Sequence, residues 1–279
     1  NATALLAKEL IARPHAWQLV LEVSTPALSA VAFSPTESHT LIHEELPLDC
    51  TARPHLDALE DAVYNNPMLL LDFKSVQVIY DTPHFMPLPS EMSPLAPRIL
   101  TKAFSADAIQ RTQTVQNPIE VLGCSIAFAV PEAELGFINR TFHNAEIMHP
   151  LAPLATWMRT RHPTRRRGKT LVNLRPHRLD LIILGEEAPL AINSYSITCA
   201  ADALYYILAA RQTHRLPDTD EIFIAGEREL RAQTSALLRR YVRFVMPVIF
   251  PSSMFRAGRA AFDAPFEAIV APMMHTESQ

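Results

Sequence analysis

Glycine is scarce in this sequence and proline is abundant. The 279 residues include six glycines and 23 prolines, whereas an average usage of about 7% would give roughly twenty glycines. Glycine lets backbone N–H groups approach a phosphate closely, and it recurs in the phosphate-binding loops GxxxxGK[ST] and GxGxxG. Neither loop occurs in the chain, and the GxSxG turn of serine hydrolases is also absent. The sequence therefore favours a protein without catalytic activity over an enzyme.

Cysteines and long apolar runs are also few. Cys50, Cys124 and Cys199 lie far apart, without CxxC spacing and without the density of a disulfide scaffold, so reduced thiols are the simplest interpretation. The most apolar stretches, such as 179–184 and 242–250, are much shorter than the roughly 20 residues of a membrane-spanning helix. These features predict a cytoplasmic protein that does not insert into a membrane. A leader removed before residue 1 stays an open alternative.

Charge is low and nearly balanced, apart from one basic run. Charged residues make up 19% of the chain and the formal net charge is -4, so no global field steers the protein to nucleic acid or acidic membranes. The run contains Arg165, Arg166, Arg167 and Lys169. It could bind nucleic acid by neutralising phosphates, but no aromatic residue interleaves to stack a base. A solvated linker between two domains is the favoured interpretation, and nucleic-acid binding is kept as a third hypothesis.

The first half of the chain has a pattern of three strands, a helix and a strand. Segments 17–23, 28–33 and 40–46 are rich in valine, leucine and aromatic residues and are separated by turn residues, which predicts an antiparallel meander. Apolar spacing predicts a helix over 54–65, and 76–80 is typical of a buried strand. Five prolines between 83 and 97 then predict a rigid irregular stretch that is neither a central strand nor a helix interior.

The same order returns in the second half. A linking region comes first, with predicted strands at 121–130 and 145–148 and predicted helices at 131–142 and 151–161. Three predicted strands follow at 171–175, 179–184 and 190–196, and then a helix over 199–211 with Thr198 as its N-cap. The last predicted elements are a strand at 221–225, a helix over 228–240 and an apolar segment at 242–250. The starts of the four corresponding strands differ by 154 (17 and 171), 151 (28 and 179), 150 (40 and 190) and 145 residues (76 and 221). These near-constant offsets predict an internal duplication.

Two consecutive copies of this element order resemble the duplicated ribonuclease-H-like domains of the actin, Hsp70 and sugar-kinase superfamily. The segments VQVIYDTPHFMPLPSEM (76–92), LAINSYSITCAADALYYILAARQ (190–212) and EIFIAGE (221–227) resemble an uncharacterised bacterial family that is described only as a domain of unknown function with an actin-like ATPase fold. The resemblance implies an α/β protein with mixed sheets and helices on both faces. We predict two tandem ribonuclease-H-like domains, 1–164 with a proline-rich elaboration and 165–279.

The resemblance also implies where a nucleotide would bind. Superfamily members hold ATP phosphates in one hairpin turn per domain, typically an acidic residue followed by glycines. The first turn here is Glu22 followed by VSTP, which keeps an acid but has no glycine and ends in Pro26. The second turn reads NLRPH at 173–177 and has neither the acid nor a glycine. The phosphate-binding turns are therefore degenerate.

Three further residues stand at positions where a superfamily member would contact the nucleotide. Gly226, followed by Glu227, matches the glycine pair that lies under the adenosine, although one glycine before a helix is also favoured by the turn alone. Asp81 directly follows the fourth strand, where open α/β sheets place functional groups, but an Asx-type turn before proline explains it more simply. Glu22, Asp81, Gly226 and Glu227 are the candidate nucleotide-binding residues, either functional or vestigial.

No metal site is predicted. His39 and His43 lie four residues apart, but in an extended strand this spacing separates the two rings by roughly 13 Å.

Two functions from different classes fit these observations. The leading hypothesis is a non-catalytic scaffold that binds another protein through the proline-rich segment 82–97 or a cleft between the domains, with no cofactor. The alternative is an atypical ATP-binding protein or kinase that uses Glu22, Asp81 and Gly226 with magnesium.

Overall fold

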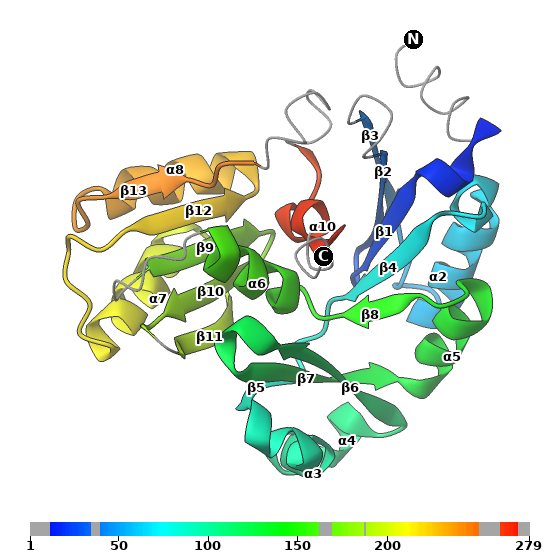
Figure 1. The fold of residues 1–279 in the computed structure, drawn as a ribbon, viewed down its shortest axis with the longest axis horizontal. Coiled ribbons are helices and arrows are strands. Elements are labelled where there is room, and N and C mark those ends of the chain that lie inside the picture. The colour runs from blue at the N-terminus through cyan, green and yellow to red at the C-terminus, as the bar shows by residue number, and fades with distance from the viewer. Residues whose placement is uncertain (1–11, 35–39, 162–168, 187, 251–262, 273–279) are drawn as a thin grey trace. The chain divides into compact units, whose positions relative to one another are not determined.

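The computed structural model describes residues 12–34, 40–161, 169–186, 188–250 and 263–272 (Figure 1). The chain divides into two compact units. Unit 1 contains 1–117, 125–153 and 250–279, and unit 2 contains 118–124 and 154–249. We describe each unit by itself.

The core of unit 1 is a five-stranded mixed sheet. Its strands are β1 (Gln18–Val23), β2 (Ala27–Ser34), β3 (Thr40–Pro47), β4 (Ser75–Tyr80) and β8 (Glu146–Met148), in the order β3-β2-β1-β4-β8. The first three strands form the antiparallel meander, whereas β4 runs parallel to β1 and β8 runs parallel to β4. All of β2 and nearly all of β1 are buried, which explains their near-continuous apolar sequences.

Helices cover both faces of this sheet. Figure 1 shows α2 (His55–Tyr64) and α5 (Glu132–Thr141) on one side and α10 (Phe266–Val270) on the other. Tyr64 of α2 meets Phe137 of α5 edge to face, with ring centroids 5.9 Å apart. Gln77 Nε2 of β4 donates to Ala271 O, 3.4 Å away, just after α10. Short 3-10 helices lie at η1 (Pro14–Ala16) and η2 (Pro67–Leu70).

A second, three-stranded sheet is inserted between β4 and α5. The insertion runs through β5 (Phe85–Pro89), η3 (Ser90–Leu95), α3 (Ala96–Ala103), α4 (Ala106–Ile109), β6 (Thr112–Ile119), η4 (Glu120–Leu122) and β7 (Cys124–Pro131), with strand order β5-β7-β6. The irregular stretch predicted over the prolines was thus wrong, since the structure has regular elements there. Pro87 and Pro89 lie on an edge strand and Pro97 lies in the first turn of α3, as expected for proline, but Pro94 lies inside the 3-10 helix η3.

Unit 2 repeats the main sheet of unit 1. Its elements are β9 (Lys169–Arg175), β10 (Arg178–Leu184), β11 (Pro189–Ser196), α7 (Ala200–Thr213), β12 (Ile222–Gly226), α8 (Arg228–Leu238) and β13 (Val245–Pro247), in the strand order β11-β10-β9-β12-β13. Again three antiparallel strands are followed by two strands that are parallel to the first. Helix α6 (Leu151–Arg161) precedes the unit's first strand.

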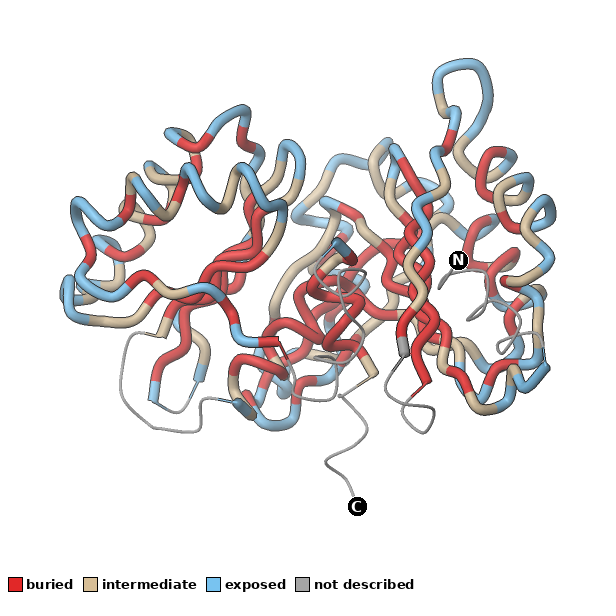
Figure 2. Tube along the Cα trace, turned by 90° about the horizontal axis from the view of Figure 1, so that it is seen from above, coloured by how far each residue is buried: buried red, intermediate tan, exposed pale blue. Residues whose placement is uncertain are grey.

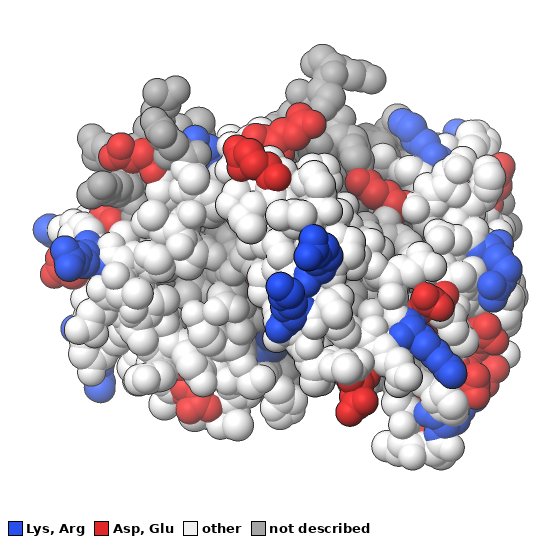
Figure 3. Space-filling model, turned by 90° about the horizontal axis from the view of Figure 1, so that it is seen from below, with Lys and Arg blue, Asp and Glu red and all other residues white. Residues whose placement is uncertain are grey.

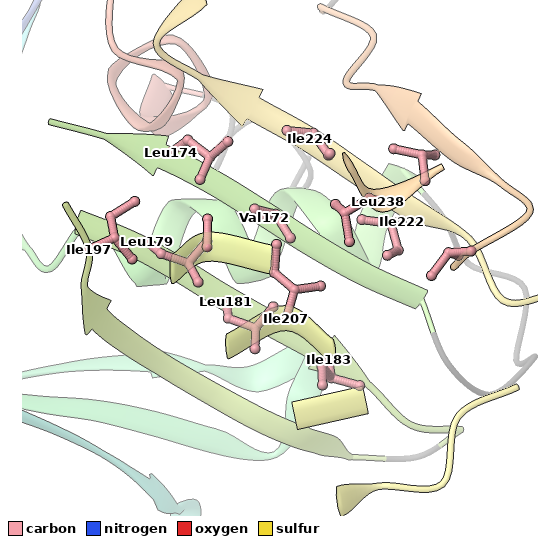
Figure 4. Packing of buried hydrophobic residues seen from close by; sticks show 13 residues of the cluster. Val172, Leu174, Leu179, Leu181, Ile183, Ile197, Ile207, Ile222, Ile224 and Leu238 are labelled. Atoms are coloured by element: carbon pink, nitrogen blue, oxygen red, sulfur yellow. The ribbon is translucent and has the colours of Figure 1, made fainter. Parts of the chain in front are cut away.

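The core of unit 2 lies between the sheet and its helices. Figure 4 shows leucine, valine and isoleucine side chains from β9, β10 and β12 packed with Ile207 of α7 and Leu238 of α8. Both of these helix residues are completely buried. Figure 2 shows the same arrangement along the chain: the central strands are buried and the outer turns of the helices are exposed.

The identical strand orders and directions confirm the predicted duplication and the α/β fold class. Two details differ from the sequence-based expectations. The N-cap of α7 is Cys199, and Thr198 instead donates from N and Oγ1 to Asp202 Oδ2, at 2.7 and 2.6 Å. The domain boundary at 164/165 stays a prediction, but the compact units differ from it at the C-terminus, because α10 contacts β1 of unit 1.

Candidate functional site

The carboxyl ends of β1 and β4 bring two of the candidate residues onto adjacent strands of unit 1. The two strands are parallel, with Val23 opposite Tyr80, and Asp81 N donates to Val23 O at 2.9 Å. Glu22 is only 5% exposed, whereas Asp81 is half-buried. The hydroxyl of Thr82 accepts a hydrogen bond from His84 N at 3.2 Å, across Pro83.

The first hairpin turn is held by bonds within unit 1. Ser24 donates both its N–H and its hydroxyl to Ala27 O, at 3.1 and 2.8 Å. The carbonyl of Thr25 accepts from Cys50 Sγ at 3.2 Å, and the carbonyl of Pro26 accepts from Leu48 N at 3.0 Å. Since proline has no N–H and the Ser24 N–H is already used, Thr25 is the one residue of this three-residue turn left with an uncommitted amide. The turn does not offer the row of amides that a phosphate needs.

A buried polar cluster fixes this turn to α5. Glu134, in the first turn of α5, is 7% exposed. Its Oε2 accepts from the Tyr80 hydroxyl at 2.7 Å and lies 3.0 Å from His55 Nδ1. His55 Nε2 lies 3.2 Å from Ser24 O, and because a carbonyl can only accept, Nε2 carries a proton. The imidazole therefore bridges the hairpin turn and the buried carboxylate.

The environment of this cluster shifts two pKa values. The hydrogen bond to Glu134 raises the pKa of His55, although burial acts in the opposite direction. Burial and the nearby Glu134 carboxylate raise the pKa of Tyr80, so the phenol stays a donor at neutral pH. Sequence reasoning missed the cluster, because its members come from three elements that are far apart in the chain. An acid in the first turn of a helix was its one local signal.

In unit 2, two arginines beside the second hairpin turn form ion pairs with a buried aspartate. Asp180 on β10 is 1% exposed. Its carboxylate lies 2.8 Å from Arg178 Nε and 3.3 Å from Arg175 Nη2, and it also accepts from the Ser194 hydroxyl. The turn residue His177 has a left-handed φ of 62°. The acid nearest this turn is thus neutralised by side chains of the same sheet, and it lies on the second strand of the hairpin.

Gly226 and Glu227 have structural roles at the start of α8. A Cβ atom at Gly226, where φ is +98°, would lie 1.9 Å from Leu174 O, so only glycine fits where β12 meets β9. Glu227 is the N-cap of α8, and its carboxylate accepts from the backbone N of Glu229 and Leu230 at 2.8 and 2.7 Å. A helix N-terminus is a ready anion site. Here the chain's own carboxylate occupies it.

The comparison with known families agrees with this picture. A family described as "Protein of unknown function (DUF3822)" matches residues 10–245. The chain belongs to this family. None of the curated proteins matches it in sequence. The family assignment supplies no activity.

Two solved structures show that the fold of this DUF3822 protein is actin-like. One is a Bacteroides thetaiotaomicron protein of unknown function with an actin-like ATPase fold, which is 16% identical with a TM-score of 0.74 and covers 85% of this chain and 92% of that chain. The other is the PilM-PilN type IV pilus biogenesis complex, 15% identical with a TM-score of 0.56, covering 92% of this chain and 97% of that chain. The resemblance predicted from the sequence is thereby confirmed for family and fold.

The predicted basic patch falls largely outside the described residues. Arg165, Arg166 and Arg167 lie there, and Lys169, the first residue of β9, has its Nζ 3.9 Å from Glu221 Oε2. On the face drawn in Figure 3, basic and acidic side chains lie in small separate groups and not in one broad field. Nucleic-acid binding through this patch stays a hypothesis.

Within the residues that the structure describes, no three histidine, cysteine, aspartate or glutamate side chains are grouped to hold a metal ion. None of the described helices has the length and apolarity needed to cross a bilayer.

Proposed function

We propose that this DUF3822 protein is a non-catalytic scaffold that binds another protein on an actin-like fold. The observation that carries the proposal is the closed hairpin turn of unit 1, where Ser24 donates its N–H and its hydroxyl to Ala27 O and Pro26 has no N–H, so that no row of amides is left for a phosphate. At the position that the resemblance implies for the adenosine, the Glu227 carboxylate already accepts from two amides at the start of α8.

The similarity to a two-protein complex supports the binding part of the proposal. The PilM-PilN structure is, by its description, a complex of type IV pilus biogenesis, and its fold resembles that of this chain over nearly the full length. An actin-like fold of this kind can therefore serve protein assembly. The proposal transfers this general role alone, and leaves the identity of the partner open.

The proline-rich segment 82–97 is the surface that we propose for the partner. Met92 is 40% exposed and Leu95 is 46% exposed, on the short helix η3 beside the edge strand β5. Leu88 and Ala96 of this segment are buried, and they pack with Leu100 and Ala127 in one hydrophobic cluster. Prolines reduce the conformational freedom that such a segment loses on binding. A rigid surface with exposed apolar side chains suits protein recognition.

Nucleotide binding decides between the scaffold and the alternative ATP-binding protein. We expect no heat when ATP and magnesium are titrated into the full chain by calorimetry, and no shift of the melting temperature at millimolar ATP. Saturable binding that disappears in Asp81→Asn would contradict the proposal and would support the alternative. Asp81 suits this control because its half-buried side chain lies at the end of β4, so the substitution leaves the core intact.

The docking surface is tested with a charge substitution on η3. We expect a partner captured by the wild-type chain to be lost by the double variant Met92→Glu with Leu95→Glu. The control is Tyr205→Glu, which adds one negative charge at a 67% exposed aromatic on α7. Equal capture by all three chains would exclude this surface, and loss in the control alone would place the partner on α7.

A further inference from the structure

A six-residue segment directly after α8 combines positive charge with exposed aromatic rings. It reads RRYVRF at 239–244 and contains no acidic residue. Five of its six side chains are exposed. We call them the basic–aromatic turn: Arg239, Arg240, Tyr241, Arg243 and Phe244.

The backbone of this turn is firmly held. Tyr241 N donates to Leu238 O at 2.9 Å, so the last turn of α8 tightens before the chain reverses. Val242, 3% exposed, anchors the segment in the core of unit 2. Phe244 O then accepts from Ile222 N at 2.9 Å. The five exposed side chains therefore extend from a turn whose backbone is held in place.

Among the described residues, the arginines of the turn are not held in ion pairs, although Arg243 N donates to Asp218 O at 2.9 Å. Within the part of the chain that the structure describes, Arg239, Arg240 and Arg243 form no ion pair. The Arg243 guanidinium lies over the Phe244 ring, 5.4 Å from its centroid. A favourable interaction with the helix dipole explains basic residues at the end of α8, but it does not reach Arg243 and does not explain exposed rings.

The turn also exposes two aromatic side chains. Tyr241 is 57% exposed and Phe244 is 43% exposed. A partner for this surface must supply negative charge and must also receive large side chains that project outward from the protein.

We propose that the basic–aromatic turn docks unit 2 onto a membrane surface that contains anionic phospholipids. Guanidinium groups bind lipid phosphates in a bidentate manner, and each basic residue near an anionic surface strengthens binding. Tyrosine and arginine are suited to the headgroup region, where the apolar part of the side chain is buried and the polar end stays wet. This inference goes beyond the proposed scaffold function, and neither depends on the other.

The short extent of the turn favours a lipid surface over single-stranded nucleic acid. Proteins that bind single strands track the backbone along an extended basic groove, whereas all five side chains here come from one segment of six residues. Nucleic-acid binding is therefore an outcome that the test distinguishes.

Vesicle sedimentation tests the proposal directly. We expect the full chain to sediment with vesicles of phosphatidylcholine containing about 30% phosphatidylglycerol, and not with phosphatidylcholine alone. Arg239→Gln, Arg240→Gln and Arg243→Gln combined should reduce the affinity by about fivefold per arginine removed. Added salt should weaken the wild-type interaction, because it screens exposed charges.

A matched variant separates this surface from net charge. Arg98→Gln, Lys102→Gln and Arg111→Gln also remove three positive charges, from exposed positions in the insertion of unit 1, and should bind like the wild type. Equal losses in both triple variants would overturn the proposal, as would absence of sedimentation at low salt. Binding to a single-stranded oligonucleotide but not to vesicles would replace lipid by nucleic acid.

A fluorescence measurement reports whether the turn itself meets the bilayer. In Phe244→Trp, the emission should shift to the blue when anionic vesicles are added, and brominated lipids should quench it. Phe244 is exposed, so the substitution does not disturb the core. An unchanged spectrum while the protein sediments would show that another surface binds the vesicles.

Discussion

Gly226 illustrates how a residue that looks functional can be required by packing alone. An added Cβ would lie 1.9 Å from Leu174 O, and the left-handed φ of +98° strains any other residue. We expect Gly226→Ala to lower the free energy of unfolding by about 3 kcal/mol or more, measured by urea denaturation. The control is Gly123→Ala, where φ is +61° but no atom lies within 4 Å of the added Cβ. That change should cost only about 1 kcal/mol, and similar costs at both sites would refute the packing explanation.

His55 gives the stability of unit 1 a defined pH dependence. Its hydrogen bond to Glu134 raises its pKa, so the folded chain binds this proton more tightly than the unfolded chain does. The stabilisation is complete below the ordinary histidine pKa of about 6.5 and is lost as the pH rises through the raised value. The melting temperature of the wild type should therefore exceed that of His55→Gln at low pH, and the difference should shrink with rising pH. A difference that does not change with pH would contradict the assignment.

His43 supplies a control of opposite sign. Its pKa is lowered, mainly by burial, and its Nε2 lies 3.0 Å from the Ser29 hydroxyl. Its contribution is complete above the ordinary pKa of about 6.5 and is lost as the pH falls through the lowered value. The effect of His43→Gln on the melting temperature should consequently grow with rising pH. If the melting temperatures of the two variants changed with pH in the same way, neither histidine would account for the pH dependence of stability.

At the scale of elements, the sequence predicts most strands of the two main sheets and misses β5 and β6 of the inserted sheet. The two antiparallel meanders and the helices after them were predicted nearly to the residue, because their apolar and β-branched segments are bounded by turn residues. Strand β6, with the sequence TQTVQNPI, was missed, since its residues are mostly polar and give no continuous apolar signal. The Tyr80, Glu134 and His55 cluster was missed for another reason. Its geometry exists only after three distant elements have packed.

Asn117 joins the inserted sheet to the main sheet of unit 1. On β6, its Nδ2 donates to Ile147 O of β8 at 2.9 Å, and its Oδ1 accepts from His149 N at 2.7 Å. We expect Asn117→Ala to cost about 2–3 kcal/mol in urea denaturation, because two backbone groups at this junction lose their partner. Gln113→Ala, at an exposed position on the same strand, should cost less than about 0.5 kcal/mol. Equal small effects would mean that water replaces the asparagine at no cost.

At the scale of the whole molecule, the duplicated sheet accounts for the fold, and the differences between the copies account for the proposed functions. The first copy alone is interrupted by the inserted sheet, which carries the proline-rich segment proposed for protein binding. The second copy alone has the basic–aromatic turn after α8. The first hairpin turn is closed by the hydrogen bonds of Ser24 to Ala27 O, and the start of α8 is capped by Glu227.

The C-terminal helix tests how the chain divides into cooperative units. Helix α10 lies in unit 1, with Ile269 fully buried, whereas the boundary predicted from the sequence would place it in the second domain. A buried charge in Ile269→Asp should therefore loosen the strands with which α10 packs. We expect faster amide hydrogen exchange in β1 and β4 by mass spectrometry, with β9 and β10 unchanged. Leu238→Ala, which opens a cavity in the unit 2 core, should give the converse pattern. Faster exchange in β9 and β10 with Ile269→Asp would instead support the boundary at 164/165.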